Sequence, residues 1–230
     1  QLGLFNRGNR FPELISSVIQ KVVLRMSMPV FSKLQDDPVQ LTNAVTKSSK
    51  IIAFISFPLL FFIMIKAEDI TIFLFTAKWS GSIIFMHFFC IIKLFEPFIA
   101  IQRELILAKG DSKLLLRIFI FTSLFEILLT LFLIRFGILY VVFSTIIARI
   151  VQFITYTKFN PANNGWRSLA EYRWAGPYFL MTAAMALTVL GLEAVIHFTH
   201  LTLPLVVKLM VEFGLGGLVY LLLAYKIKVD

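Results

Sequence analysis

The stretch that decides the fold is IIFMHFFCIIKLFEPFIAIQRELILA, residues 83–108. A helix needs about 20 mostly apolar residues to cross a bilayer, and this stretch is longer than that. It therefore predicts a transmembrane helix. Four charged residues interrupt it, Lys93, Glu96, Arg103 and Glu104. At the helical period they fall within about 100° of arc, so they share one face.

Stretches of the same kind lie on both sides of residues 83–108 and predict an all-α, polytopic transmembrane bundle of about seven helices. Residues 2–34 form the most polar of these stretches and read as an amphipathic helix. We expect the whole chain, residues 1–230, to be one transmembrane bundle. The predicted spans are 2–34, 51–75, 83–108, 114–134, 136–156, 174–198 and 201–225.

The composition excludes an ordinary soluble domain, because 59% of the residues are hydrophobic and only 15% are charged. The 22 Lys and Arg outnumber the 13 Asp and Glu, giving a net charge of +9. In a soluble chain this excess would favour nucleic acid as a partner. Here the basic residues gather between apolar stretches, where they orient a membrane protein, so we expect no nucleic-acid partner.

The basic residues between the spans alternate along the chain, and this alternation predicts the topology. Alternate connections and the C-terminus are basic, so the positive-inside rule places them in the cytoplasm and residue 1 outside. The chain begins at Gln1, inside a predicted span, so we expect it to be the back part of a longer protein. The basic residues are Lys33, Lys47, Lys50, Lys109, Lys113, Arg117, Lys158, Arg167, Arg173, Lys226 and Lys228.

Residues 2–34 carry four cations on one helical face: Arg7, Arg10, Lys21 and Arg25 fall within about 60° of arc. Asn6 lies beside them. Each cation at the bilayer centre costs roughly 2.5 to 3.5 kcal/mol, so this cationic stripe should face water, a partner helix or an anion. We interpret it as the wall of an internal cavity that binds substrate. Two alternatives are an interfacial amphipathic helix and snorkelling of the cations to the headgroups.

Charges in later spans are candidates for ion coupling or gating. Lys93, Glu96 and Arg103 are three of them. For Lys93 and Glu96, an ion pair between residues three apart on one helix explains the presence of both charges equally well. Glu126, the deepest acidic residue, is a fourth candidate. Arg149, Glu193, Lys208 and Glu212 are further charges in or near spans. No motif for a metal, a nucleotide or a catalytic nucleophile is visible, so we expect neither a cofactor nor an enzyme.

Several linear motifs resemble one transporter family. LGLFNRGNRFPELISSVI followed by LRMSMPVFSKLQDD is similar to the pattern LGxYNRAxxL and then RxxFPVFSKLQDD in polysaccharide exporters of the Wzx type, within the MATE-like lipid-flippase superfamily. FPLLFFIMIKAEDI, FLFTAKW and LAKGDSK match further motifs in order. Met28 and Thr76-Ala77 depart from the pattern. The resemblance is strongest over residues 2–80 and rests on hydropathy alone after about residue 112.

The resemblance implies a flippase for undecaprenyl-diphosphate-linked oligosaccharide, with this chain as the second of two pseudo-symmetric bundles. Arg7, Arg10 and Arg25 stand at matching motif positions and imply contacts to the diphosphate. The implied location is the bacterial inner membrane. The implied partners are the lipid-linked oligosaccharide, membrane lipids, the preceding half of the chain and a polysaccharide polymerase. Alternatives are a drug or lipid II exporter, a prenyl-phosphate transferase and a noncatalytic assembly partner.

Overall fold

The computed structural model describes residues 2–159, 172–199 and 204–227, and every regular element within those ranges is helical. Seven helical segments are long and apolar enough to cross a membrane. The predicted all-α class with about seven membrane-spanning helices is therefore confirmed, and the chain is a multi-pass membrane protein. The α-helices are α1 (Leu2–Lys33), α2 (Pro38–Ile65), α3 (Ala67–Phe75), α4 (Ile83–Ala108), α5 (Ser112–Leu133), α6 (Ile138–Phe159), α8 (Ala175–Phe198) and α9 (Leu205–Ile227).

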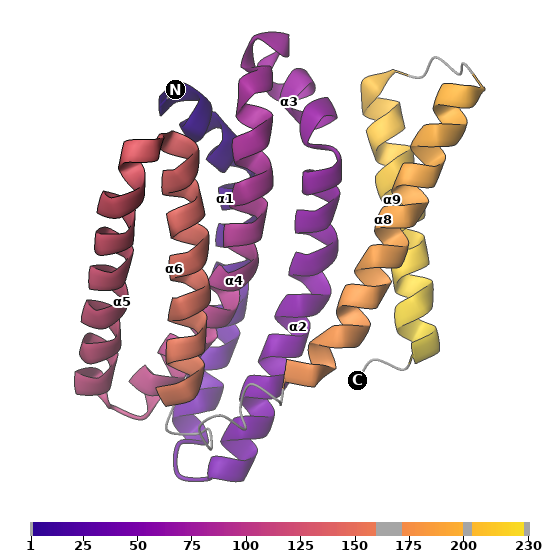
Figure 1. Cartoon of the computed structure of the whole chain (residues 1–230). Helices are drawn as coiled ribbons and strands as arrows, with labels where there is room; N and C mark the ends of the chain where they lie inside the picture. The colour runs from indigo at the N-terminus through magenta and orange to yellow at the C-terminus, as the bar shows by residue number, and fades with distance from the viewer. Residues whose placement is uncertain (1, 160–171, 200–203, 228–230) are drawn as a thin grey trace.

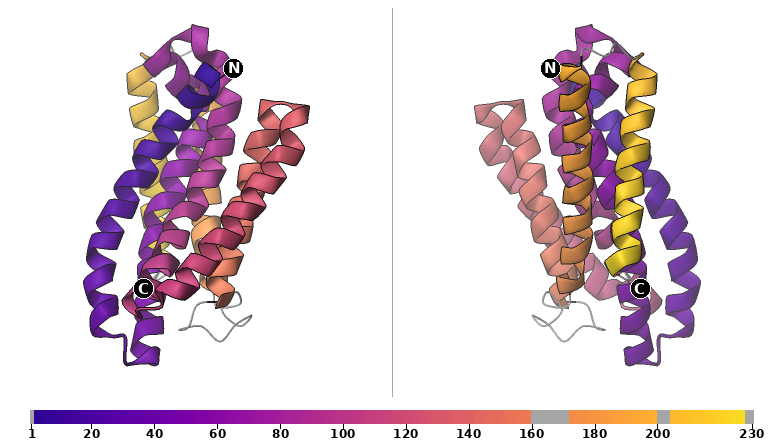
Figure 2. Two further views of the ribbon diagram at one scale, coloured as in Figure 1. Left: turned by 90° about the vertical axis from the view of Figure 1, so that its left-hand side faces the viewer. Right: turned by 90° about the vertical axis from the view of Figure 1, so that its right-hand side faces the viewer.

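The bundle has a centre and two flanking hairpins (Figure 1). Helices α2 and α4 form the centre, and α1 packs mainly against α4. The α5–α6 hairpin joins one side through α6 and α4, while the α8–α9 hairpin joins the other side through α8 and α2. The views in Figure 2 show that α1 covers one face of this centre and that the α5–α6 hairpin leans away from it at one end. Helix α1 therefore lies at the periphery of the bundle.

The second span is the one that the sequence places least accurately. Residues 51–75 were expected to form it, but α2 begins at Pro38 and ends at Ile65, and α3 is a separate short helix. Asp37 caps α2 because its Oδ1 accepts hydrogen bonds from the backbone N–H groups of Val39 (3.1 Å) and Gln40 (3.0 Å). These bonds, with Gln40 the stronger contributor, lower the pKa of Asp37. Hydropathy misses the first half of α2 because those residues are polar.

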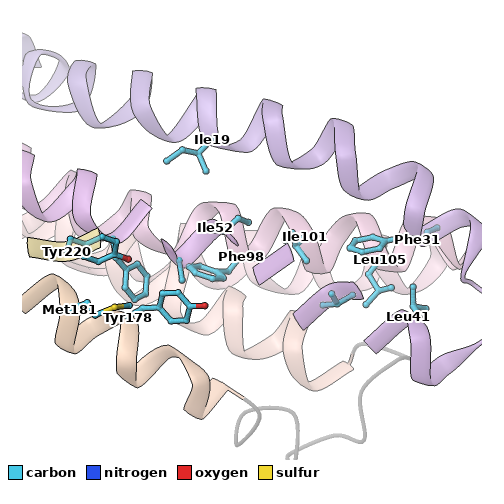
Figure 3. Close-up of a cluster of buried hydrophobic side chains, with 14 of the residues drawn as sticks. Ile19, Phe31, Leu41, Ile52, Phe98, Ile101, Leu105, Tyr178, Met181 and Tyr220 are labelled. Atoms are coloured by element: carbon cyan, nitrogen blue, oxygen red, sulfur yellow. The ribbon is translucent and has the colours of Figure 1, made fainter. Parts of the chain in front are cut away.

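The core of the bundle lies where α1, α2, α4, α8 and α9 converge. Its buried side chains include Leu41, Ile52, Ile101 and Met181 (Figure 3). Tyr220 from α9 donates a hydrogen bond to the Phe54 carbonyl at 3.0 Å. Many apolar side chains on α5, α8 and α9 remain exposed, which suits helices that face lipid. This core thus holds the α8–α9 hairpin to the central helices.

Gly8 allows α1 to approach α4 closely, at the end of α1 that carries Arg7 and Arg10. A Cβ at this position would lie 2.6 Å from Phe85 Cβ and 2.9 Å from the Met86 backbone nitrogen. Both contacts are far shorter than van der Waals distance, and one involves backbone that cannot easily move. Glycine at this position therefore fixes where the first turns of α1 lie.

We expect Gly8→Ala to lower the free energy of unfolding by about 1 to 3 kcal/mol, because the added methyl group overpacks the α1–α4 contact. Thermal or SDS unfolding of the purified protein measures this loss. Gly217→Ala on α9 is the matched control, because nothing lies within 4 Å of its Cβ position. That variant should be neutral or slightly stabilised. Equal losses in both variants would show that the close approach at Gly8 is unimportant.

The predicted alternation of connections agrees with the arrangement of the helix ends. The turn at residues 34–37, the turn at residues 109–111 and the C-terminal end of α9 lie together at one end of the bundle (Figure 1). The N-terminus, α3 and the turn at residues 134–137 lie at the opposite end. Arg167 and Lys228, expected at the basic end, fall outside the described residues. Which end faces the cytoplasm stays a prediction.

Candidate functional site

The cationic stripe occupies the face of α1 that points away from the rest of the bundle. Arg7, Arg10, Lys21 and Arg25 are all exposed, whereas Gly8, Pro12, Ser16 and Ile19 on the opposite face are buried. Helical geometry puts these two sets about half a turn apart. Within the described residues no carboxylate pairs with any of the four cations. The stripe therefore presents uncompensated positive charge outward.

The first turns of α1 form one side of a pocket. It has a volume of about 470 Å³ and is lined by Gly3, Asn6, Arg7, Arg10 and Trp79. The Arg7 guanidinium lies 4.9 Å from the ring centres of both Phe75 and Trp79, which is within cation–π range. These aromatic contacts orient Arg7 without neutralising its charge. The pocket is thus a polar, cationic recess with an aromatic wall.

The structure brings together three of the five predicted substrate-binding residues. Asn6, Arg7 and Arg10 share this pocket, while Lys21 and Arg25 lie farther along the same face of α1 and do not line it. The sequence did not identify Trp79 as part of the site. It follows the turn at Thr76, and only the packing of the 3₁₀ helix η1 (Ala77–Ser82) against α1 places it beside Arg7.

A second polar group joins α1 to α4. Lys93 Nζ contacts the Glu13 carboxylate and lies 2.7 Å from Glu96 Oε1. The Glu96 carboxylate also accepts hydrogen bonds from Gln20 (3.3 Å) and Ser16 (3.5 Å). The expected pair between Lys93 and Glu96 therefore forms, and it is part of a larger network. Each charge has an opposite partner, as intramembrane charges require. A role in coupling stays a prediction.

The other two coupling candidates also have ionic partners. Arg149 Nη2 on α6 lies 3.5 Å from Glu126 Oε1 on α5. Arg149 Nη1 also donates a hydrogen bond to Gln152 Oε1 at 2.6 Å. Arg103 lies 3.5 Å from its neighbour Glu104. The Glu126–Arg149 pair joins the two helices of the α5–α6 hairpin. Its geometry accounts for both charges without an ion-coupling role, which stays untested.

The most deeply buried charges form a cluster that the sequence did not predict. Lys66 Nζ lies 2.9 Å from Glu212 Oε1 and 3.0 Å from Glu193 Oε2. Lys208 Nζ lies 3.1 Å from both Asp69 Oδ2 and Glu193 Oε1. The side chains of Lys66 and Glu212 are completely buried. We call these five residues the Lys66 cluster.

The Lys66 cluster ties the α8–α9 hairpin to the α2–α3 junction. Lys66 stands at the break between α2 and α3, Glu193 belongs to α8, and Lys208 and Glu212 belong to α9. In the sequence Lys66 reads as a residue of a connecting loop, and its partners Glu193 and Glu212 are more than a hundred residues away. Charged residues inside otherwise apolar spans are the signal that could have pointed to the cluster, but they do not reveal which partners meet.

The first third of the chain matches a known family model, and the whole chain is distantly similar to one curated protein. Residues 1–84 match the family model described as "Polysaccharide biosynthesis protein". The chain is also 23% identical, over 235 aligned residues, to the teichuronic acid biosynthesis protein TuaB of Bacillus subtilis. That alignment covers 98% of this chain and 46% of TuaB. The chain therefore spans about half the length of the curated relative that it matches. No solved structure matches it.

The matched family segment contains the principal site residues. Residues 1–84 include all of the cationic stripe, the pocket with Trp79, and Lys66 and Asp69 of the Lys66 cluster. The similarity agrees with the resemblance drawn from the motifs, which is also strongest over residues 2–80. It supports a membrane protein similar to those of polysaccharide biosynthesis.

Proposed function

We propose that this chain is the second half of an exporter that moves an undecaprenyl-diphosphate-linked oligosaccharide across the bacterial inner membrane. The observation that carries the proposal is the cationic stripe of α1, which faces away from the bundle and has no carboxylate partner among the described residues. Four such charges facing lipid would together cost on the order of 10 kcal/mol. An anionic cargo in a water-filled cavity removes that cost.

The chemistry of the stripe suits a diphosphate. Arginine presents planar N–H donors that bind phosphate oxygens in a bidentate manner. Arg7 and Arg10 line one pocket together with the Asn6 side chain, which gives two guanidinium groups and one amide on a single surface. The diphosphate and its sugars would exchange hydration for these donors, while the prenyl tail stays in lipid. Alternating access would then carry only the headgroup.

The second wall of the cavity would come from the other half of a longer protein. The alignment with TuaB covers 46% of that relative, and exporters built from two repeats bind substrate between them. Because α1 lies at the periphery with its stripe outward, it is placed to face a second bundle (Figure 2). Membrane lipids would surround the remaining helices, and a polysaccharide polymerase would receive the cargo. In this account the C-terminus is cytoplasmic and the protein is not an enzyme.

Two alternative functions predict different surfaces. An exporter of cationic drugs would need an acidic cavity, whereas the outward face of α1 is basic. A prenyl-phosphate transferase that uses Mg²⁺ would need clustered carboxylates. Among the described residues no three or more His, Cys, Asp or Glu side chains are placed so that they could hold a metal ion. The same basic face would also suit a lipid II exporter, whose cargo carries a diphosphate too.

Deleting the gene from its host separates these functions. We expect lipid-linked oligosaccharide to accumulate in the membrane while surface polysaccharide is lost, because synthesis continues and only export stops. Mass spectrometry of the extracted lipids measures the precursor. If the precursor never forms, the protein acts in synthesis. If lipid II accumulates instead, the cargo is lipid II and the oligosaccharide assignment is wrong.

A further inference from the structure

Glu13 is the carboxylate closest in sequence to the pocket arginines, and on α1 it lies between the exposed face and the face that packs against α4. At the helical period it lies about 60° from Arg10 on one side and about 60° from Ser16 on the other. Ser16 belongs to the buried face against α4. Glu13 therefore stands at the border between the cationic stripe and the α1–α4 contact. Its carboxylate could reach Arg10, because side chains three apart on a helix are neighbours.

In the structure Glu13 turns toward α4 and contacts Lys93. The Lys93 side chain is 9% exposed and the Glu13 side chain 48% exposed, so the lysine is the fixed partner and the glutamate the adaptable one. Lys93 is held in turn by Glu96, which Ser16 and Gln20 of α1 bind as well. The two carboxylates near Lys93 thus have a cation, while Arg10 has no carboxylate partner among the described residues.

We propose that Lys93 is a positioning residue, which draws Glu13 away from Arg10 and so keeps Arg10 available for an anionic ligand. Without Lys93, Glu13 would have no cation on α4, and Arg10 would be the nearest one on its own helix. An intrahelical pair of Arg10 and Glu13 would then compete with the ligand. This inference rests on the proposed anion site, and it assigns Lys93 an electrostatic role distinct from ion coupling.

Removing Lys93 and removing Glu13 should have opposite effects on anion binding. Lys93→Gln should weaken anion binding even though Lys93 does not line the pocket. Adding Glu13→Gln to that variant should restore binding, because the competing carboxylate is gone. If Lys93 acted only by packing or by neutralising Glu96, Glu13→Gln would not restore binding, because Glu96 would still lack its cation. Glu13→Gln alone leaves Lys93 paired with Glu96 and should bind at least as tightly as the unchanged protein.

The test is a titration of inorganic pyrophosphate into the protein in lipid nanodiscs at low ionic strength, followed by tryptophan fluorescence because Trp79 lines the pocket. We expect Lys93→Gln to raise the dissociation constant about tenfold or more, the size of one lost charge-assisted bond. Glu13→Gln/Lys93→Gln should return it to within about twofold of the unchanged protein, and Lys93→Arg should retain binding.

The outcomes separate this inference from the proposed function. If the unchanged protein does not bind pyrophosphate, the anion site itself is wrong. If it binds and Lys93→Gln binds equally well, the site stands and the role of Lys93 is refuted. A weakened Lys93→Gln that Glu13→Gln fails to restore also refutes it, and so does weaker binding by Glu13→Gln alone, a variant that leaves the buried lysine in place.

Discussion

Replacing Lys66 with methionine is expected to lower the free energy of unfolding by about 3 to 5 kcal/mol, the usual result of removing one partner from a buried ion pair. Lys66 Nζ is the cation bonded to Glu212, 2.9 Å away, and both side chains are completely buried. The other oxygen of that carboxylate, Oε2, already has no hydrogen-bond partner. Methionine would leave Glu212 with an unpaired charge inside the bundle. SDS or thermal unfolding measures the loss.

A double variant distinguishes lost pairing from lost packing. Lys66→Met/Glu212→Leu removes both charges of the buried pair, and Lys208 still bridges Asp69 and Glu193 at 3.1 Å. It should therefore be more stable than Lys66→Met alone. Lys78→Met, an exposed lysine near the same end of the bundle, is the control and should change stability by less than about 0.5 kcal/mol. A double variant less stable than Lys66→Met would contradict the explanation.

Replacing Arg7 and Arg10 together with alanine is expected to abolish surface polysaccharide without lowering the amount of protein. The two guanidinium groups line one pocket and provide the planar donors that a diphosphate needs. Both are exposed and have no acidic partner in the part of the chain that the structure describes, so their loss should cost little stability. Each hydrogen bond to a charged ligand group contributes about 1.5 to 3 kcal/mol. Each guanidinium can donate two such bonds, so losing both arginines would lower the affinity for the cargo by several orders of magnitude.

The matched control is Arg135→Ala. The turn between α5 and α6, which contains Arg135, lies at the same end of the bundle (Figure 1). The Arg135 guanidinium lies 5.2 Å from the centre of the Phe132 ring. It carries the same charge as Arg7 and also contacts an aromatic ring, but it is not in the pocket. We expect Arg135→Ala to produce normal amounts of surface polysaccharide. Arg7→Lys/Arg10→Lys should produce an intermediate amount, because lysine keeps the positive charge but lacks the planar pair of N–H donors. Normal polymer from the alanine double variant would remove these residues from the site.

The sequence predicts the fold well because a bilayer imposes strong constraints on helix length. The predicted span 83–108 coincides with α4, and the other expected spans correspond to observed helices. The errors occur where polar residues extend a helix beyond its apolar part. Residues 38–50 of α2 are the main example, since an Asp37 cap and Pro38 begin that helix well before its apolar segment. Hydropathy indicates which residues contact lipid, whereas capping residues such as Asp37 determine where a helix begins.

The candidate site was predictable only where its residues share one helix. The stripe from Arg7 to Arg25 follows from the helical period alone, and the structure places it on one exposed face. Trp79, by contrast, enters the pocket through packing between distant segments. The Lys66 cluster likewise joins residues 146 positions apart, Lys66 and Glu212. Periodicity carries no information about such contacts, because they depend on how whole helices pack.

The most direct test of the central claim is the leaflet distribution of lipid-linked oligosaccharide in cells that carry Arg7→Ala/Arg10→Ala in the complete protein. A membrane-impermeant probe of the sugar, applied to spheroplasts before and after permeabilisation, measures how much lies on each side. If the stripe of α1 binds the diphosphate during export, the oligosaccharide should remain on the cytoplasmic side at normal total abundance. A normal fraction on the outer side would show that the stripe does not carry this cargo.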